Sequence, residues 1–185
     1  MFELEFINQI EDDDIKKQLW EILCECDQEF IPPLSSRDSS SQKELSDLNQ
    51  STVKPISYFE KMMEQKFILV FNKPNEVVAF MTFIHHYSCE ELQAIGFSNY
   101  ITTICVRKNY RNQGILSKLY DYMEGHIEDS YIENYISTRT WSTNVYHLKT
   151  LKNRGYEMGT VLKDHRGEGI DTIYLYKDTQ WPNNA

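Results

Sequence analysis

The residues best suited to bind a charged ligand lie in one segment of the second half of the chain. No acid occurs between Glu91 and Asp121, a window of 29 residues in a chain of net charge −9. That window holds four cations, which are Arg107, Lys108, Arg111 and Lys118. A strand that leads through a turn into a helix beginning at glycine, here Gly114, presents free backbone N–H groups that bind phosphate. The segment therefore predicts a phosphate site, the alternative being a basic loop with a helix-starting glycine.

Such a segment needs a strand before it and a helix after it, and the whole chain is built from these two kinds of element. Apolar runs predict strands near residues 2–7, 67–71, 77–84, 100–106, 131–139, 156–162 and 172–176. Helical spacing predicts helices after the acids at 12–14, from near residue 55, and over about 114–128 and 143–153. Strands separated by helices imply an α/β fold with a sheet of mixed direction. We find no repeat or linker, and so expect a single domain over residues 1–185 with a mobile or substrate-facing polar loop at 34–41.

Composition excludes several classes of protein. A chain with 41% hydrophobic and 13% aromatic residues has the apolar side chains to form a core, which excludes a disordered protein. Its apolar runs fall far short of the ~20 residues that cross a bilayer, and its first residues lack the pattern of a signal peptide. We therefore expect a cytoplasmic protein without a membrane partner.

Charge and cysteine content narrow the partners further. Residues 1–100 hold 18 acids and 8 bases, whereas residues 101–185 hold 10 acids and 11 bases. An acidic chain lacks the basic face that nucleic acid requires, and its front half would attract a cationic partner. The four cysteines show neither a CxxC pair nor a zinc-finger spacing with histidines, so we expect free thiols and no metal.

Two separate motifs of the chain resemble those of one family. Arg111-Asn112-Gln113-Gly114-Ile115-Leu116, after an apolar strand, resembles the Arg/Gln-x-x-Gly-x-Gly/Ala acetyl-CoA signature of the GNAT N-acetyltransferases. It departs from that signature at Leu116, where the family has a small residue. Downstream, the run from Asn144 to Tyr156 resembles the asparagine-led helix of the family, which ends in Gly-Phe or Gly-Tyr. The resemblance implies a GNAT-like, acyl-CoA N-acyltransferase fold, a mixed, splayed β-sheet flanked by helices.

The resemblance also implies how acetyl-CoA would be held. In GNAT folds the cofactor lies where two strands of the sheet part, and here these would end at Val106 and near Arg139. Backbone groups of Ile104 and Val106, on either side of Cys105, would pair with the pantetheine arm as a further strand does. The pyrophosphate would be bound by backbone N–H groups of the signature, which are those of Arg111, Asn112, Gln113, Gly114, Ile115 and Leu116, with Ser117 beside them. Asn144 would hydrogen-bond the pantetheine, the alternative being an ordinary helix cap.

Acetyl transfer to an amine also requires a base. An amine with a pKa near 10.4 is protonated at neutral pH, so another group must take its proton before it can attack. We select Glu91, just before the cofactor strand, as the candidate. The neighbouring candidates are Glu90, His85 and His86, and each of them also suits an ordinary solvated loop residue.

The departing thiolate needs a proton donor, and here the chain departs most from the family. Many members carry a tyrosine seven residues after the helix asparagine, where this chain has Leu151. His147 shares the helical face of Asn144 and Leu151, so it is the candidate to replace the tyrosine as donor or as base. The alternative is a packed histidine that is hydrogen-bonded to the sheet. Tyr146 lies elsewhere on an ideal helix and is the weaker candidate.

Taken together, these features predict an acetyl-CoA-dependent N-acetyltransferase that acts on a primary amine of a small molecule or peptide. The alternative is a non-catalytic acyl-CoA-binding sensor of the same fold, which the missing tyrosine and Leu116 leave open. A nucleotide-phosphate binder would require a Walker-type loop, and the sequence contains none. The acceptor is expected to be a cationic amine, and a homodimer is left open.

Overall fold

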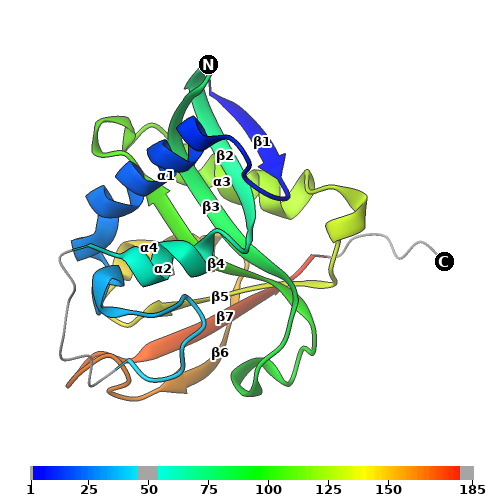
Figure 1. The fold of residues 1–185 in the computed structure, drawn as a ribbon. Helices are drawn as coiled ribbons and strands as arrows, with labels where there is room; N and C mark the ends of the chain where they lie inside the picture. Colours follow the sequence, from blue (N-terminus) through cyan, green and yellow to red (C-terminus); the bar gives the residue numbers. More distant parts are fainter. Residues whose placement is uncertain (1, 46–53, 180–185) are drawn as a thin grey trace. The chain divides into compact units, whose positions relative to one another are not determined.

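A computed structural model describes residues 2–45 and 54–179 of the chain (Figure 1). It contains a sheet of seven strands in the order β1-β2-β3-β4-β5-β7-β6. The strands are β1 (Glu3–Ile7), β2 (Lys66–Lys73), β3 (Glu76–Tyr87), β4 (Ser98–Val106), β5 (Tyr135–Trp141), β6 (Glu157–Leu162) and β7 (Thr172–Asp178). The α-helices are α1 (Asp13–Cys26), α2 (Ile56–Met62), α3 (Ile115–Gly125) and α4 (Val145–Asn153). Short 3₁₀-helices are η1 (Asp27–Glu29), η2 (Leu34–Ser36), η3 (Glu90–Leu92), η4 (Lys108–Tyr110) and η5 (Asp129–Tyr131).

Both directions of strand pairing occur in this sheet. The pairs β1–β2, β2–β3, β5–β7 and β6–β7 are antiparallel. Strands β4 and β5 run parallel, with Asn99–Ile101 opposite Ile136–Thr138. At the last of these pairs the Thr138 hydroxyl donates to the carbonyl oxygen of Ile101 at 3.0 Å. The predicted mixed α/β sheet is thus confirmed.

The chain forms two compact units, and strands β3 and β4 run through both of them. The first unit comprises the chain up to Phe83 together with Thr102–Ile127, and so contains β1, β2 and the helices α1, α2 and α3. The second comprises Ile84–Ile101 together with the chain from Glu128 onward, and contains β5, β6, β7 and α4.

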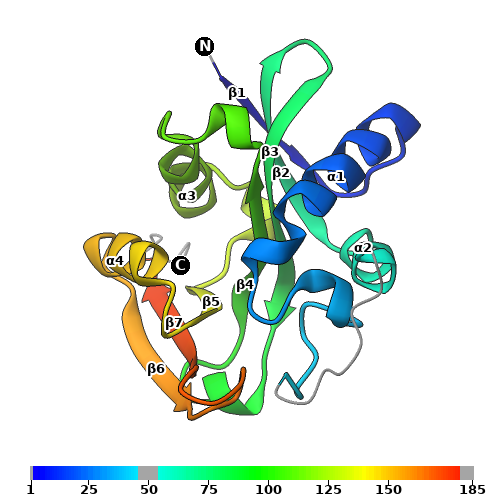
Figure 2. The same ribbon diagram turned by 90° about the vertical axis from the view of Figure 1, so that its left-hand side faces the viewer.

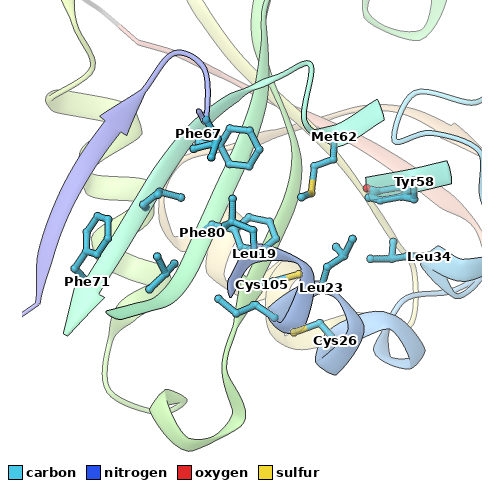
Figure 3. Close-up of a cluster of buried hydrophobic side chains, with 14 residues drawn as sticks. Leu19, Leu23, Cys26, Leu34, Tyr58, Met62, Phe67, Phe71, Phe80 and Cys105 are labelled. Atoms are coloured by element: carbon cyan, nitrogen blue, oxygen red, sulfur yellow. The ribbon is translucent and has the colours of Figure 1, made fainter. Parts of the chain in front are cut away.

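In the first unit, α1 and α2 lie on one side of strands β2 and β3, and α3 lies on the other (Figure 2). Side chains of β2 alternate between these sides, and those of Phe67, Leu69 and Phe71 join the core beneath α1 and α2. Figure 3 shows this core, in which Leu19 and Leu23 of α1 pack with strand residues. Helical spacing places these leucines on one face, so burial of that face fixes α1 against the sheet.

The second unit has a smaller core of aromatic and aliphatic side chains. Leu92, Tyr100 and Tyr174 are buried there, and Tyr87 packs against them. The rings of Tyr87 and Tyr100 are stacked, with centroids 4.5 Å apart and planes inclined by 15°. Offset stacking of this kind adds to the hydrophobic gain of burying two large rings.

One expectation about local structure was wrong. The strand expected over 131–139 begins only at Tyr135, because residues 129–131 form η5 and residues 132–134 lie in no helix or strand. The polar loop expected at 34–41 is partly buried. It contains η2, and Arg37 is buried and donates from Nε and Nη2 to the Pro32 carbonyl oxygen at 2.9 and 2.6 Å.

Candidate functional site

The loop between β4 and α3 turns through two residues with left-handed backbone. After Val106 the chain passes through η4, and Asn112 and Gly114 then adopt φ values of 60° and 74°. Such values cost an ordinary L-residue roughly 1–2 kcal/mol, whereas glycine adopts them freely and asparagine tolerates them. Gly114 is the N-cap of α3, so the turn into this helix requires a glycine at the position that the signature predicts.

The first turn of α3 leaves backbone donors without a partner inside the helix. The N–H groups of Ile115, Leu116 and Ser117 precede the first helical bond, which runs from Lys118 N–H to the Gly114 carbonyl oxygen at 3.1 Å. No side chain in the described part of the chain caps this end, since the N-cap residue Gly114 has none. Unpaired donors at the positive end of a helix attract an anion, so this turn suits a phosphate group.

The side chain of Arg111 is used inside the protein. Its Nε donates to the Val106 carbonyl oxygen at 3.1 Å, and its Nη1 donates to Glu29 Oε1 at 2.9 Å. Its Nη2 lies 3.6 Å from Cys26 Sγ. Hydrogen bonding to Glu29 raises the pKa of the Arg111 guanidinium above its ordinary value. Arg111 therefore anchors the loop to the end of β4 and to η1.

Arg107 and the backbone of Lys108 are also engaged by acids. Arg107 Nη2 lies 3.2 Å from Glu21 Oε2, and its Nη1 lies 3.9 Å from Glu25 Oε2. The Lys108 N–H donates to Glu25 Oε1 at 2.5 Å. Glu21 and Glu25 of α1 and Glu29 of η1, four residues apart, form what we call the glutamate row. The basic segment expected from the sequence is thus partly neutralised by this row.

The strand residues expected to meet the pantetheine arm differ in their surroundings. Cys105 is buried in the core of the first unit, so a role in ligand binding would fall to its backbone. Ile104 and Val106 are half-buried. Because the Arg107 N–H donates to the Val78 carbonyl oxygen of β3 at 2.9 Å, the alternation of a strand directs the N–H of Val106, and likewise that of Ile104, away from β3.

Two buried thiols lie beside the anchor of the loop. Cys26 Sγ is hydrogen-bonded to the Cys105 thiol, and this bond lowers the pKa of Cys26. Burial raises the pKa of Cys105 well above its ordinary value. Cys26 Sγ also lies 3.8 Å from the Val106 carbonyl oxygen. The four cysteines of the chain are free thiols, as expected from the sequence.

In the second unit, Asn144 and His147 share a hydrogen-bonded group with Thr140 of β5. The Asn144 side-chain amide donates to Thr140 Oγ1 at 3.2 Å, and His147 Nδ1 lies 3.3 Å from the same oxygen. Asn144 Oδ1 accepts from the His147 N–H at 3.4 Å, so Asn144 caps α4. The two predicted residues are therefore brought together, and His147 is bonded to the sheet.

Burial determines the charge of His147. It lowers the pKa of the imidazole from its ordinary value of 6.5 to about 4, because the surrounding protein disfavours the cation. The ring is therefore neutral at pH 7. If the Thr140 hydroxyl donates to Nδ1, the remaining ring proton sits on Nε2, which is then a hydrogen-bond donor.

The candidate bases lie in a different part of the second unit. Glu91 is half-buried in η3, its carbonyl oxygen accepts from Thr160 Oγ1 at 2.9 Å, and its carboxylate is hydrogen-bonded to the Cys89 thiol. Burial, followed by this bond, raises the pKa of Cys89. His85 Nδ1 lies 2.9 Å from Asn99 Oδ1, and His86 Nδ1 lies 2.7 Å from Glu133 Oε1. Glu91, His85 and His86 are thus each held by a partner, whereas Glu90 is exposed.

Sequence reasoning missed the glutamate row and the role of Thr140. The acids of the row recur at positions i, i+4 and i+8, a spacing that places them on one helical face. That periodicity could have indicated a common partner, which the total charge alone does not. Nothing in the sequence around Thr140 indicates its contacts with α4.

Residues 2–45 and 54–179 contain neither a membrane-spanning helix nor a cluster of metal-binding side chains. None of the helices there is long and apolar enough to cross a bilayer. Nor does any group of three or more histidine, cysteine, aspartate or glutamate side chains have a geometry able to hold a metal ion.

Comparison with known proteins was made at the level of sequence and of structure. No sequence match was found among curated proteins. The structure is similar to the ribosomal-protein-S18-alanine N-acetyltransferase of Escherichia coli, with 10% identity, a TM-score of 0.62 and coverage of 100% of this chain and 99% of that one. It is also similar to an N-acetyltransferase of Staphylococcus aureus, with 13% identity, a TM-score of 0.61 and coverage of 97% and 98%.

A third structure is similar over a smaller part of the chain. It belongs to a protein of Bacillus anthracis assigned as a streptothricin acetyltransferase, in complex with acetyl coenzyme A. The identity is 19% and the TM-score 0.49, and the alignment covers 62% of each chain, which is less than two thirds of either.

A family model gives the assignment. The model described as the acetyltransferase (GNAT) family matches residues 17–156, which includes the glutamate row, the loop before α3 and the helix led by Asn144. The two similar structures that align over nearly all of this chain share its fold. The resemblance drawn from the two motifs is confirmed, and the chain belongs to the GNAT family of acetyltransferases.

Proposed function

We propose that the protein transfers the acetyl group of acetyl-CoA to a primary amine. The observation that carries this proposal is the turn at Gly114, where the unpaired N–H groups of the first turn of α3 follow a buried strand. This arrangement occurs at the residues that match the acetyl-CoA signature. It supports binding of the pyrophosphate by the backbone from Arg111 to Leu116, with the Ser117 hydroxyl beside it.

The other cofactor contacts belong to the same proposal. Ile104 and Val106, with Cys105 between them, would pair through their backbone with the amides of the pantetheine arm. Asn144 would hydrogen-bond the arm through its side chain while it continues to cap α4. A residue that accepts from a helical N–H still has its amide protons and a second lone pair for other partners.

The reaction itself needs two proton movements. The free amine attacks the acetyl carbonyl carbon and its nitrogen becomes cationic; the C–S bond then breaks, CoA departs as the thiolate, and the nitrogen loses one proton to become the amide nitrogen of the product. We assign proton removal to Glu91 and assistance of the thiolate to His147. A neutral His147 acts at pH 7 as an N–H donor, because its lowered pKa leaves it a weak base.

The acceptor is proposed to be a cationic amine. The front half of the chain carries 18 acids against 8 bases and would raise the local concentration of a positively charged substrate. Polyamines, amino sugars and peptide amino groups share this chemistry.

One observation favours a second function, that of a non-catalytic acyl-CoA-binding sensor. The position of the family tyrosine is taken by Leu151, which is fully buried and has no ionisable group that could donate a proton. His147, the only replacement that we propose, is bonded to Thr140. A sensor would bind the cofactor without turning it over.

Thiol release from acetyl-CoA distinguishes the two functions. Wild-type protein is mixed with acetyl-CoA and each member of a panel of polyamines, amino sugars and peptides, and free CoA is measured with a thiol reagent, while calorimetry measures CoA binding. We expect binding, and turnover with at least one cationic amine. Binding without turnover across the panel would favour the sensor, and absence of binding would refute both functions.

A further inference from the structure

We propose that the glutamate row, Glu21, Glu25 and Glu29, positions the backbone of the pyrophosphate-binding loop. This inference rests on the proposed binding of acetyl-CoA by that loop. The row belongs to α1 and η1, far from the acetyl-CoA signature in sequence. Its carboxylates contact residues 107, 108 and 111 of the loop, and not the free N–H groups at the start of α3. The three glutamates are therefore positioning residues that act through Arg107, Lys108 and Arg111.

Glu25 holds the start of the loop. Its Oε1 accepts the N–H of Lys108 at 2.5 Å, and Lys108 is the first residue of η4. Its Oε2 lies 3.9 Å from Arg107 Nη1, and about a quarter of each side chain is exposed, at 26% for Glu25 and 24% for Arg107. A hydrogen bond from backbone to a carboxylate fixes the main chain directly, and it is stronger than one between neutral groups.

Glu29 holds the end of η4 through Arg111. Each of the three guanidinium nitrogens has a contact inside the protein: Nε with the Val106 carbonyl oxygen, Nη1 with Glu29 and Nη2 with Cys26 Sγ. The next residue is Asn112, the first with a left-handed backbone. An Arg111 held on three sides therefore fixes where the turn toward Gly114 begins.

The opposite side of the loop is tied to the β2–β3 hairpin. The Tyr110 hydroxyl donates to Glu76 Oε1 at 2.9 Å, and the Asn72 side-chain amide lies 3.3 Å from the same hydroxyl. The hydrogen bonds from Asn72 and Tyr110 lower the pKa of Glu76. Contacts with the glutamate row and with this hairpin thus hold residues 107–111 in place, and the free N–H groups follow at the start of α3.

An inhibitory role for the row is the competing explanation. If the glutamates merely occupied cations that would otherwise bind phosphate, removing them would strengthen CoA binding. The contacts of Arg111 favour positioning, because two of its three nitrogens stay bonded to Val106 and Cys26 when Glu29 is removed. The two lysines of the segment, Lys108 and Lys118, are in no ion pair among the described residues and are the cations left for phosphate.

The test compares two acetyl donors, one of which lacks the pyrophosphate. Glu25→Ala and Glu29→Ala are assayed with acetyl-CoA and with S-acetylpantetheine, and CoA binding is measured by calorimetry. We expect each variant to raise the KM for acetyl-CoA and the Kd for CoA about tenfold, as for the loss of one charge-assisted hydrogen bond, with kcat unchanged. The kcat/KM for S-acetylpantetheine should not change, because that donor has no group for the loop to bind.

Two controls separate positioning from general damage. Glu25→Gln keeps an oxygen acceptor for the Lys108 N–H and should recover most of the affinity lost in Glu25→Ala. Glu64→Gln breaks an exposed ion pair of the same unit, Lys61 Nζ to Glu64 Oε1 at 3.0 Å. This variant should leave the kcat/KM for both acetyl donors unchanged. Equal losses with both donors, or tighter CoA binding in the variants, would overturn the inference. Wild-type protein that fails to bind CoA would instead overturn the proposed function, and the inference with it.

Discussion

His147 is a candidate site residue whose charge is determined by its surroundings. From the helical pattern it is either a proton donor or a packed histidine, and the structure shows a ring bonded to Thr140 with its pKa lowered to about 4. These properties are compatible with each other, since a neutral ring held by the sheet can still donate a hydrogen bond. The sequence could place His147 on the correct face, but not reveal Thr140, because that contact joins a strand to a helix.

We expect His147→Ala to lower kcat by about a hundredfold, the order of the loss when one hydrogen-bond donor to a developing negative charge is removed. The KM for acetyl-CoA should stay close to the wild-type value. Steady-state rates with saturating amine provide the measurement. His126→Ala, which removes an exposed histidine at the end of α3, is the control and should leave kcat unchanged. A wild-type rate in His147→Ala would remove this residue from the mechanism.

The same histidine makes folding stability depend on pH. In the unfolded chain it binds a proton as the pH falls below about 6.5, whereas in the folded protein it does so only near pH 4. The unfolded state therefore binds more protons between these values, and the free energy of unfolding falls as the pH drops through this window. Denaturant unfolding at pH 7 and pH 5 should show a smaller loss for His147→Ala than for the wild type.

At the scale of elements, the unit formed by β4, the loop and α3 combines a local feature with a distant one. The turn at Gly114 is local, and its glycine, its helix start and the preceding apolar run are all legible in the sequence. The contacts of Arg107 and Arg111 with the glutamate row are not, because no local pattern states which helix covers the end of β4. The acetyl-CoA signature was therefore predicted correctly from the sequence. The positive charge of residues 107–118 was overestimated, because Arg107 and Arg111 are paired with glutamates.

Strand boundaries show the same division. The apolar runs predicted every strand, but strand ends depend on the partner, as at β5, where Tyr135 lies opposite Asp178 of β7. Of the residues before Tyr135 that the sequence assigned to the strand, Tyr131 lies in η5 and residues 132–134 lie in no helix or strand. Pairing decides such ends, and a single sequence does not record it.

We expect Gly114→Ala to weaken CoA binding beyond its effect on stability. An added Cβ at Gly114 meets no atom within 4 Å, so the folded protein would suffer only the cost of a φ of 74°, roughly 1–2 kcal/mol. Gly155→Ala is the matched control, because Gly155 has a φ of 84° and equally open surroundings. Both variants should lose similar stability in urea, whereas only Gly114→Ala should raise the Kd for CoA. Equal affinities in the two variants would contradict a close approach of ligand to Gly114.

For the whole molecule, the charge distribution is the property that sequence and structure describe most differently. In the sequence, an acidic front half precedes a nearly neutral second half. In the structure, three acids of the front half, those of the glutamate row, form ion pairs with Arg107 and Arg111 of the second half. Most of the 18 acids of the front half lie outside this row and still contribute to the negative electrostatic potential of the front half. A net charge of −9 thus remains a reason to expect cationic acceptors.

We expect the KM for a triamine to rise more steeply with salt than the KM for a monoamine. The Debye length falls from about 10 Å at 0.1 M salt to about 3 Å at 1 M, so long-range attraction by the acidic half is lost over this range. Initial rates at several sodium chloride concentrations, with acetyl-CoA saturating throughout, would measure both slopes. Parallel slopes would mean that the net charge does not select the acceptor.

The contacts of the glutamate row span long stretches of chain. Glu21 and Arg107 are 86 residues apart in sequence, Glu25 and Lys108 are 83 apart, and Glu29 and Arg111 are 82 apart. Closing loops of this length costs conformational entropy, and the packing of α1 against the sheet offsets this cost. A peptide that contains the acetyl-CoA signature alone therefore lacks the carboxylates that hold it. The loop between β4 and α3 is in this sense a product of tertiary folding, because side chains of distant elements hold it in place.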